Sequence, residues 1–351
     1  MAHLRSIRRL LTGVAATTAL ALVATACGGG AAEPGGEASG GGAAQDLTIT
    51  FIPKQLNNPY TDVVLGGGKE GATAAGFASA NVVGPLEASA SSQVSFINAE
   101  TQAGTNVIVI AANDPDAVGP ALQEARDGGA KIVAFDSDTA AQYRDVFISQ
   151  VVAKDVALIQ TKLIAEQIGG SGEIAILSAT ANATNQNEWI KFMEEDLKTN
   201  PAYAGIKLVA KVYGDDDDTK SFQEAQGLMQ AYPNLKGIIS PTTVGIAATA
   251  RYLSTSKYKG KVALTGLGLP NEMRTYVKDG TVKEFALWDP AQLGEVAAYA
   301  GKALADGTIT GKPGEKFTAG DLGEKTVGEN NVVIVGPPTS FNAQNIDEYD
   351  F

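Results

Sequence analysis

Histidine and cysteine are almost absent from this sequence, which has one of each, His3 and Cys27, among 351 residues. A single cysteine cannot form an internal disulfide framework, and the chain cannot assemble the cysteine and histidine ligands of a structural zinc site. Basic residues are also few, because 27 lysines and arginines face 39 aspartates and glutamates, for a formal net charge of −12. An acidic surface argues against nucleic acid and anionic membranes as partners.

The N-terminus has the pattern of an export signal. Three arginines among the first nine residues precede an uncharged run over residues 10–26, and small residues lead into Cys27. These are the marks of a secretory signal, and the run is too short and alanine-rich for a comfortable transmembrane helix. With a cysteine at the cut, the segment resembles a bacterial lipoprotein signal, although Ala24 stands where that pattern usually has leucine. We predict a signal peptide over residues 1–26 and lipidation of Cys27; an ordinary signal peptide with an incidental cysteine is the alternative.

Removal of this signal would narrow the chemistry further. His3 would leave with it, so the mature chain would have no imidazole for a Ser-His-Asp triad, and the lipidated thiol could not act as a nucleophile. The formal net charge would change from −12 to −15. Residues 27–45 are rich in glycine and alanine and are predicted to form the lipidated start and a flexible linker. The folded part would begin near Asp46, and roughly 300 residues favour two lobes over one core.

Short β-rich runs alternate with longer helical patterns beyond Asp46. Several runs, such as Val107–Ile110, are wholly apolar, which is typical of strands buried on both faces of a parallel sheet. We expect strands at 47–52, 81–84, 106–111, 131–135, 173–177, 206–213, 237–239, 261–265 and 283–287, and helices that include 154–168, 186–198, 221–232 and 292–305. The alternation predicts an α/β fold of doubly wound sheets. It falters over residues 143–152, where we place the first crossing between the lobes.

Polar and aromatic residues follow several of these strands. In open parallel sheets, ligands bind beyond the carboxyl ends of the strands. The residues found there are Lys54, Asn58, Tyr60, Asp136, Asn185, Gln186, Trp189, Pro241, Thr243 and Trp288. A carboxylate, a lysine, amides and indole rings suit a sugar, whose hydroxyls need donors and acceptors and whose C–H faces lie against aromatic rings.

These residues also have plain structural explanations. Asp136 could cap a turn and Lys54 could be a solvated lysine, but their places after buried strands favour a ligand role. Either tryptophan could be core. Trp288 precedes a helix start at Asp289-Pro290, and we keep it in the site. Trp189 lies one turn into its helix, and we expect it to pack in the core.

Two further motifs do not carry the chemistry that they resemble. Residues 66–71 match G-x-G-x-x-G, yet about a dozen residues separate them from their strand, whereas a dinucleotide fingerprint follows its strand directly. The acidic run Asp215–Asp218 lacks the glycine and distal glutamate of a calcium loop. We interpret it as a solvated, self-repelling loop.

The chain from Leu47 onward resembles the type I periplasmic (solute) binding proteins of ABC importers, and among them the rhamnose-binding and autoinducer-2-binding branch. The strings that carry this resemblance are 51–54 (FIPK), 135–139 (FDSDT), 185–189 (NQNEW), 240–246 (SPTTVGI), 270–274 (PNEMR) and 287–290 (LWDP). The resemblance implies two doubly wound, Rossmann-like lobes joined by three crossings. We predict an N-terminal lobe of residues 46–151 plus 289–331, and a C-terminal lobe of residues 152–288 plus 332–351.

The resemblance also implies a ligand site at the hinge. Carried over by position, the residues that would hold the ligand are Lys54, Asp136, Asn185, Gln186, Pro241 and Thr243, the last two through backbone groups. Autoinducer-2 binders have an aspartate where this chain has Asn185, and they lack the string 57–60 (NNPY), which resembles sugar binders of the ribose type. Both differences favour a neutral monosaccharide, rhamnose or a related aldose, and add Asn58 and Tyr60 to the site.

The implied protein is not an enzyme: it is a monomer with no cofactor, metal or catalytic residue, and delivers its sugar to an ABC permease. Autoinducer-2 is the alternative ligand. An extracytoplasmic glycosidase is a distant alternative, because it needs paired carboxylates and Asp136 has only Asp289 as a poor partner. A sensor that presents its ligand to a receptor is a third class, since one fold serves both transport and sensing.

Overall fold

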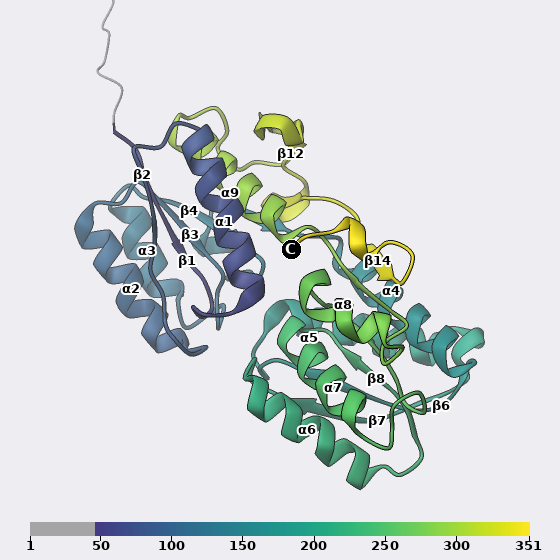
Figure 1. Cartoon of the computed structure of the whole chain (residues 1–351). Coiled ribbons are helices and arrows are strands. Elements are labelled where there is room, and N and C mark those ends of the chain that lie inside the picture. The colour runs from purple at the N-terminus through teal and green to yellow at the C-terminus, as the bar shows by residue number, and fades with distance from the viewer. Residues whose placement is uncertain (1–45) are drawn as a thin grey trace, which may run out of the picture. The chain divides into compact units, whose positions relative to one another are not determined.

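The computed structural model describes residues 46–351 (Figure 1). The predicted signal peptide, the lipidation site at Cys27 and the linker up to residue 45 lie outside the described residues. No helix within residues 46–351 is long and apolar enough to cross a membrane.

The first sheet has six parallel strands in the order β13-β5-β4-β3-β1-β2. Its strands are β1 (Thr48–Ile52), β2 (Ser79–Val82), β3 (Val107–Ile110), β4 (Lys131–Phe135), β5 (Val146–Ser149) and β13 (Val332–Ile334). Helices α1 (Pro59–Ala74) and α9 (Pro290–Ala305) cover one face, and α2 (Ala90–Ala103) and α3 (Gly119–Asp127) cover the other.

Strand β3 explains the apolar run that the sequence shows. Val107 and Val109 join the core beneath α1 and α9, whereas Ile108 and Ile110 join the core beneath α2 and α3. Because successive side chains of a strand point to opposite faces, a sheet covered on both sides needs apolar residues at every position.

The second sheet has four parallel strands in the order β7-β6-β8-β9. Its strands are β6 (Ser171–Ser178), β7 (Gly205–Tyr213), β8 (Leu235–Ser240) and β9 (Ala263–Gly266). The helices that accompany it are α4 (Ala153–Ile168), α5 (Thr184–Thr199), α6 (Asp218–Ala231), α7 (Thr243–Thr255) and α8 (Pro270–Lys278). Two antiparallel pairs are also present, β10 (Glu284–Leu287) with β14 (Thr339–Asn342) and β11 (Lys316–Thr318) with β12 (Glu324–Thr326). The predicted α/β fold with parallel sheets is confirmed.

The chain passes between the cores of the two sheets at three places. It leaves the first sheet between β5 and α4, where the sequence predicts a crossing, returns between β10 and α9, and leaves again between β13 and β14. One boundary differs from the prediction. We expected the C-terminal lobe to resume at residue 332, but β13 pairs in parallel with β5 of the first sheet, which moves this crossing past Ile334. The division into two lobes that move as units stays a prediction.

The glycine-rich segment at residues 66–71 lies inside α1, away from the end of β1. A Cβ atom on Gly67 would collide with the backbone of Ala291 in α9, and a Cβ atom on Gly294 of α9 would collide with the backbone of Val64 in α1. The glycines therefore let the two helices pack with their backbones in close approach. This packing is a structural use of the motif that requires no nucleotide.

Candidate functional site

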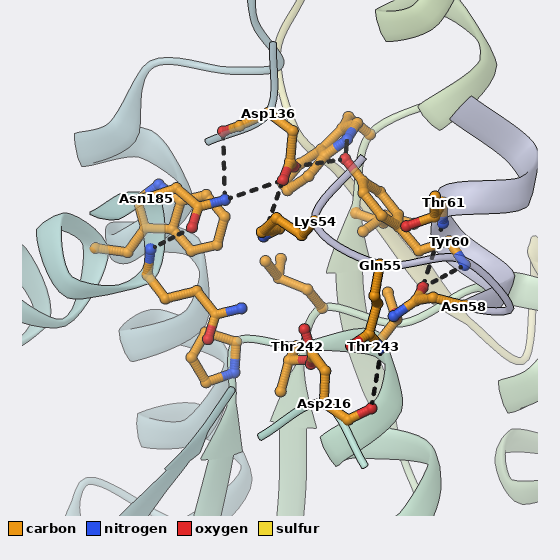
Figure 2. Close-up of a pocket in the computed structure, with 16 residues that line it drawn as sticks. Lys54, Gln55, Asn58, Tyr60, Thr61, Asp136, Asn185, Asp216, Thr242 and Thr243 are labelled. Carbon is orange, nitrogen blue, oxygen red and sulfur yellow. Dashed lines mark hydrogen bonds and ion pairs between the residues drawn. The ribbon is translucent and has the colours of Figure 1, made fainter. Parts of the chain in front are cut away.

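A cavity lies among loops that follow strands of both sheets (Figure 2). All the residues predicted to bind the ligand line it, namely Lys54, Asn58, Tyr60, Asp136, Asn185, Gln186, Pro241, Thr243 and Trp288. They come from the carboxyl ends of β1, β4, β6 and β8, as the rule for doubly wound sheets predicts, and from the end of β10. The structure thus brings them together, while their role in binding stays a prediction.

Asp136 is the centre of the polar network in this cavity. It follows β4 directly and has a φ of 58°, a left-handed conformation that is uncommon for non-glycine residues and clusters at functional sites. The ammonium of Lys54 lies 3.0 Å from Oδ2 of Asp136, and the hydroxyl of Tyr60 donates to Oδ1 over 3.0 Å. Nδ2 of Asn185 donates to the backbone oxygen of Asp136 over 3.3 Å. Because Asn185 belongs to α5, this network joins loops of the two sheets.

The loop that carries Asp136 is anchored by an arginine. Nε and one terminal nitrogen of Arg144 donate to the two carboxylate oxygens of Asp138, over 2.6 and 2.8 Å. The other terminal nitrogen donates to the backbone oxygen of Asn330 over 3.1 Å, just before β13. Arg144 is 2% exposed on its side chain, and a two-point contact of this kind fixes geometry. The loop after β4 is therefore tied to the segment that leads into the third crossing.

Lys54 carries the positive charge among the residues that line the cavity. Burial alone would lower the pKa of Lys54, but the negative charges of Asp136 and Asp216 outweigh this effect and the pKa is raised. The ammonium therefore stays protonated. Burial, together with the charge of Asp136, raises the pKa of Tyr60 well above its usual value, so its hydroxyl remains a hydrogen-bond donor.

Asn58 positions the wall formed by α1. Its Oδ1 accepts hydrogen bonds from the backbone N–H groups of Tyr60 and Thr61, over 3.0 and 3.2 Å, and so caps the helix. Asn57 before it has a φ of 58°, which asparagine tolerates better than most residues. The cap fixes where the helix begins and directs Tyr60 toward Asp136. Nδ2 of Asn58 is the group that can donate to a ligand.

The second sheet contributes amides and a helix start. Oε1 of Gln186 accepts from the hydroxyl of Ser178 over 2.6 Å and from the backbone N–H of Ala179 over 2.8 Å. This arrangement leaves Nε2 of Gln186 as the donor for a ligand. Pro241 and Thr243 lie where β8 leads into α7, and the first N–H groups of a helix have no partner within it. Such a group suits the backbone role predicted for Thr243, whereas Pro241 has no N–H and offers only its backbone carbonyl oxygen.

Two indole rings form an aromatic wall. Trp189 and Trp288 are both buried, and their ring centroids lie 5.9 Å apart. Nε1 of Trp288 donates to the hydroxyl of Tyr60 over 3.1 Å, which extends the network from Asp136. Trp189 packs in the core, as we expected from the sequence, and it also lines the cavity.

Residues 49–309 match the model of the family described as the periplasmic binding protein domain. The chain belongs to this family. Among solved structures, a sugar ABC transporter from Actinomyces odontolyticus is 73% identical, with 87% of this chain and 98% of that one covered and a TM-score of 0.72. A solute-binding protein from Clostridium phytofermentans with bound L-rhamnose is 37% identical, with the same coverage and a TM-score of 0.83. LsrB from Clostridium saccharobutylicum in complex with AI-2 is 26% identical, with 87% and 100% covered and a TM-score of 0.81.

The resemblance to solute-binding proteins of ABC importers is thus confirmed, and membership of this family implies a place outside the cytoplasm. These relatives are transport and binding proteins rather than enzymes. A glycosidase would need two carboxylates free for acid and base roles, whereas Asp136 of this periplasmic binding protein pairs with Lys54. Among the described residues, no group of three or more histidine, cysteine, aspartate or glutamate side chains is arranged to hold a metal ion.

Asp216 is the site candidate that the sequence reasoning missed. The run Asp215–Asp218 is predicted to be a solvated loop, which is wrong for Asp216, because this residue is half-buried and lines the cavity. Its loop follows β7, so the strand-end rule that selects Asp136 also selects Asp216. The remaining lining residues that were not singled out are Gln55, Thr61, Thr242, Leu267 and Leu287.

Proposed function

We propose that this periplasmic binding protein captures a monosaccharide, rhamnose or a related aldose, and delivers it to an ABC permease. The observation that carries the proposal is the composition of the cavity, which polar side chains from the loops of both sheets line together with two indole rings. Donors on Asn58 and Gln186 and the carboxylate of Asp136 match the alternating donors and acceptors of sugar hydroxyls. The two tryptophans in the lining suit a pyranose ring, whose C–H faces pack against aromatic rings.

The relatives support a sugar as the ligand, and we propose which sugar it is. The structure at 37% identity contains L-rhamnose, and the one at 73% identity is named a sugar ABC transporter. Where autoinducer-2 binders have an aspartate, this chain has Asn185, whose amide offers both a donor and an acceptor to sugar hydroxyls. Rhamnose is therefore the first ligand to test.

Closure of two lobes around the sugar is the mechanism that we propose. A ligand that contacts both lobes only in the closed form shifts the population toward that form. The cavity fits this scheme because Asn185 of α5 bonds to Asp136 of the β4 loop. The comparison supports it as well: the 73% identical chain superposes with a lower TM-score than the 37% identical one, and a different placement of similar lobes would produce this order.

Export and anchoring complete the proposal. The basic start, the uncharged run and the small residues before Cys27 support a signal peptide and a lipid anchor at that cysteine. A protein held in this way at the outer face of the cytoplasmic membrane, or in the periplasm, would remain near its permease. We propose that it acts there as a monomer.

A thermal-shift screen of the described part, residues 46–351, tests the function. L-rhamnose at about a hundred times its dissociation constant should raise the melting temperature by roughly 4 °C, because it binds only the folded state. The enantiomer D-rhamnose is the control for non-specific stabilisation by polyols. A shift with AI-2 alone would make the protein a signal receptor, and no shift with any aldose would refute the sugar proposal.

The variant Asn185→Asp tests the choice between a sugar and autoinducer-2. Aspartate cannot replace the donor that Nδ2 of Asn185 offers to Asp136, and it places a second carboxylate beside that residue. We expect affinity for L-rhamnose to fall about tenfold or more, measured by isothermal titration calorimetry. Affinity for autoinducer-2 should rise. Asn187→Asp is the matched control, because Asn187 is exposed on the same helix and bonds to the backbone of Ala181; equal effects of both variants would contradict a ligand role for Asn185.

A further inference from the structure

Asp216 is held in place by contacts from several directions. It and Asp215 have φ values of 51° and 55°, so two consecutive residues with side chains take the left-handed conformation. The hydroxyl of Thr242, which precedes α7, donates to Oδ1 of Asp216. Nε2 of Gln55, from the loop after β1, lies 3.4 Å from the backbone oxygen of Asp216 and donates to it. This backbone and these bonds present the carboxylate to the cavity (Figure 2).

We propose that Asp216 is a specificity-determining carboxylate of the sugar site, which accepts hydroxyls of a neutral sugar and excludes sugar acids and sugar phosphates. The inference rests on the proposed function and deepens it by naming the class of sugar that the site rejects. It assigns to the second sheet a carboxylate that complements Asp136 of the first.

The charges that line the cavity support this assignment. Lys54 is the one cationic side chain among the lining residues, and Asp136 and Asp216 are the two anionic ones. The ammonium of Lys54 already lies 3.0 Å from Asp136. An anionic ligand would therefore meet a site with one negative charge in excess and no unpaired cation. Repulsion between like charges is stronger in a partly buried cavity than in bulk water.

A neutral sugar is not repelled by the excess negative charge of the cavity. Each of its hydroxyls can donate to a carboxylate oxygen, and hydrogen bonds to charged acceptors are stronger than those between neutral groups. Burial raises the pKa of Asp216 and the charges of Asp136 and Asp215 add to the rise, while the charge of Lys54 and the bond from Thr242 limit it. Lys54 thus favours the ionised form of Asp216, which is the form that accepts sugar hydroxyls.

A structural role for Asp216 is the competing explanation. On that view the carboxylate serves only to hold Thr242 and to balance Lys54, and its removal would lower stability without changing which sugars bind. The two explanations differ in one measurable quantity, the ratio of affinities for a neutral sugar and its acid.

The variant Asp216→Asn separates them. Asparagine has the same shape, tolerates a positive φ and can still accept the hydroxyl of Thr242, so the variant removes the charge and little else. Asp218→Asn is the matched control, because Asp218 is exposed near the same loop and pairs with Arg251 over 2.7 Å. The probes are L-rhamnose and L-mannuronate, which has the ring stereochemistry of L-rhamnose and a carboxylate at C6. Calorimetry gives both affinities, and a melting curve reports stability.

We expect the wild-type protein and Asp218→Asn to bind L-rhamnose at least about 100-fold more tightly than L-mannuronate. Asp216→Asn should bind L-rhamnose about 10- to 100-fold more weakly and should narrow that ratio at least tenfold. An unchanged ratio in Asp216→Asn, whether or not its melting temperature falls, overturns the inference alone. If the wild-type protein binds neither L-rhamnose nor L-mannuronate, nor any other aldose, the proposed function is refuted. The inference about Asp216 is then refuted as well.

Discussion

The variant Asp136→Asn should bind L-rhamnose at least about 100-fold more weakly than the wild-type protein. The carboxylate of Asp136 pairs with Lys54, accepts from Tyr60 and lies in the cavity that we propose to hold the sugar. Its neutralisation removes an acceptor for ligand hydroxyls. It also leaves the ammonium of Lys54 without its partner once a bound sugar has displaced water. Removing one member of a buried ion pair costs about 3–5 kcal/mol, and each 1.4 kcal/mol is roughly tenfold in affinity.

Asparagine is the appropriate replacement because the φ of 58° at Asp136 would strain most other residues. In the unliganded protein the Lys54 side chain is 18% exposed, so water can solvate its charge and stability should change less than affinity. Calorimetry on Asp136→Asn, Lys54→Met and the double variant gives the coupling between the two side chains. The effects should be strongly non-additive, since the two groups share one contact. Wild-type affinity in Asp136→Asn would remove this residue from the site.

The fold could be predicted because the physics that determines it is local and repetitive. An apolar run such as Val107–Ile110 indicates a strand buried on both faces, and strands of this kind occur in sheets that helices cover. Position after a strand then located Lys54 and Asp136, because the carboxyl ends of parallel strands meet along one edge. These inferences need only the order of the elements.

The rest of the site depends on geometry that a linear pattern does not contain. Asp216 lies in a run of four aspartates whose composition indicates solvation, and its inward direction follows from the left-handed backbone at residues 215 and 216. Trp189 has the spacing of a core residue and is buried. It also lines the cavity, because the core and the cavity meet at this residue, and spacing alone does not reveal this second contact. The pairing of β13 with β5 joins residues far apart in the sequence. A strand of only three residues, Val332–Ile334, is too short to show a hydrophobic period in the sequence.

The variant Gly294→Ala should lower the free energy of unfolding by roughly 3 kcal/mol, and the melting temperature by roughly 5 °C. A Cβ atom on Gly294 would collide with the backbone oxygen of Val64, so α1 and α9 would have to separate. Gly66→Ala is the matched control. Gly66 lies in α1 with nothing within 4 Å of an added Cβ atom, and alanine there should stabilise the helix by up to about 1 kcal/mol. Chemical denaturation measures both changes, and a loss of stability in both variants would contradict the packing argument.

The variant Gly294→Ala also tests whether the packing of α1 against α9 determines the position of Tyr60 in the cavity. Helix α1 begins next to Tyr60 and α9 begins just after Trp288, and the indole of Trp288 donates to the hydroxyl of Tyr60 over 3.1 Å. Separating the two helices should lengthen this bond and turn Tyr60 away from Asp136. Affinity for L-rhamnose should therefore fall in Gly294→Ala at temperatures where the protein is fully folded, and should not change in Gly66→Ala. Reduced stability with wild-type affinity would mean that the cap at Asn58 alone positions Tyr60, and that the close approach of α1 and α9 serves the core rather than the site.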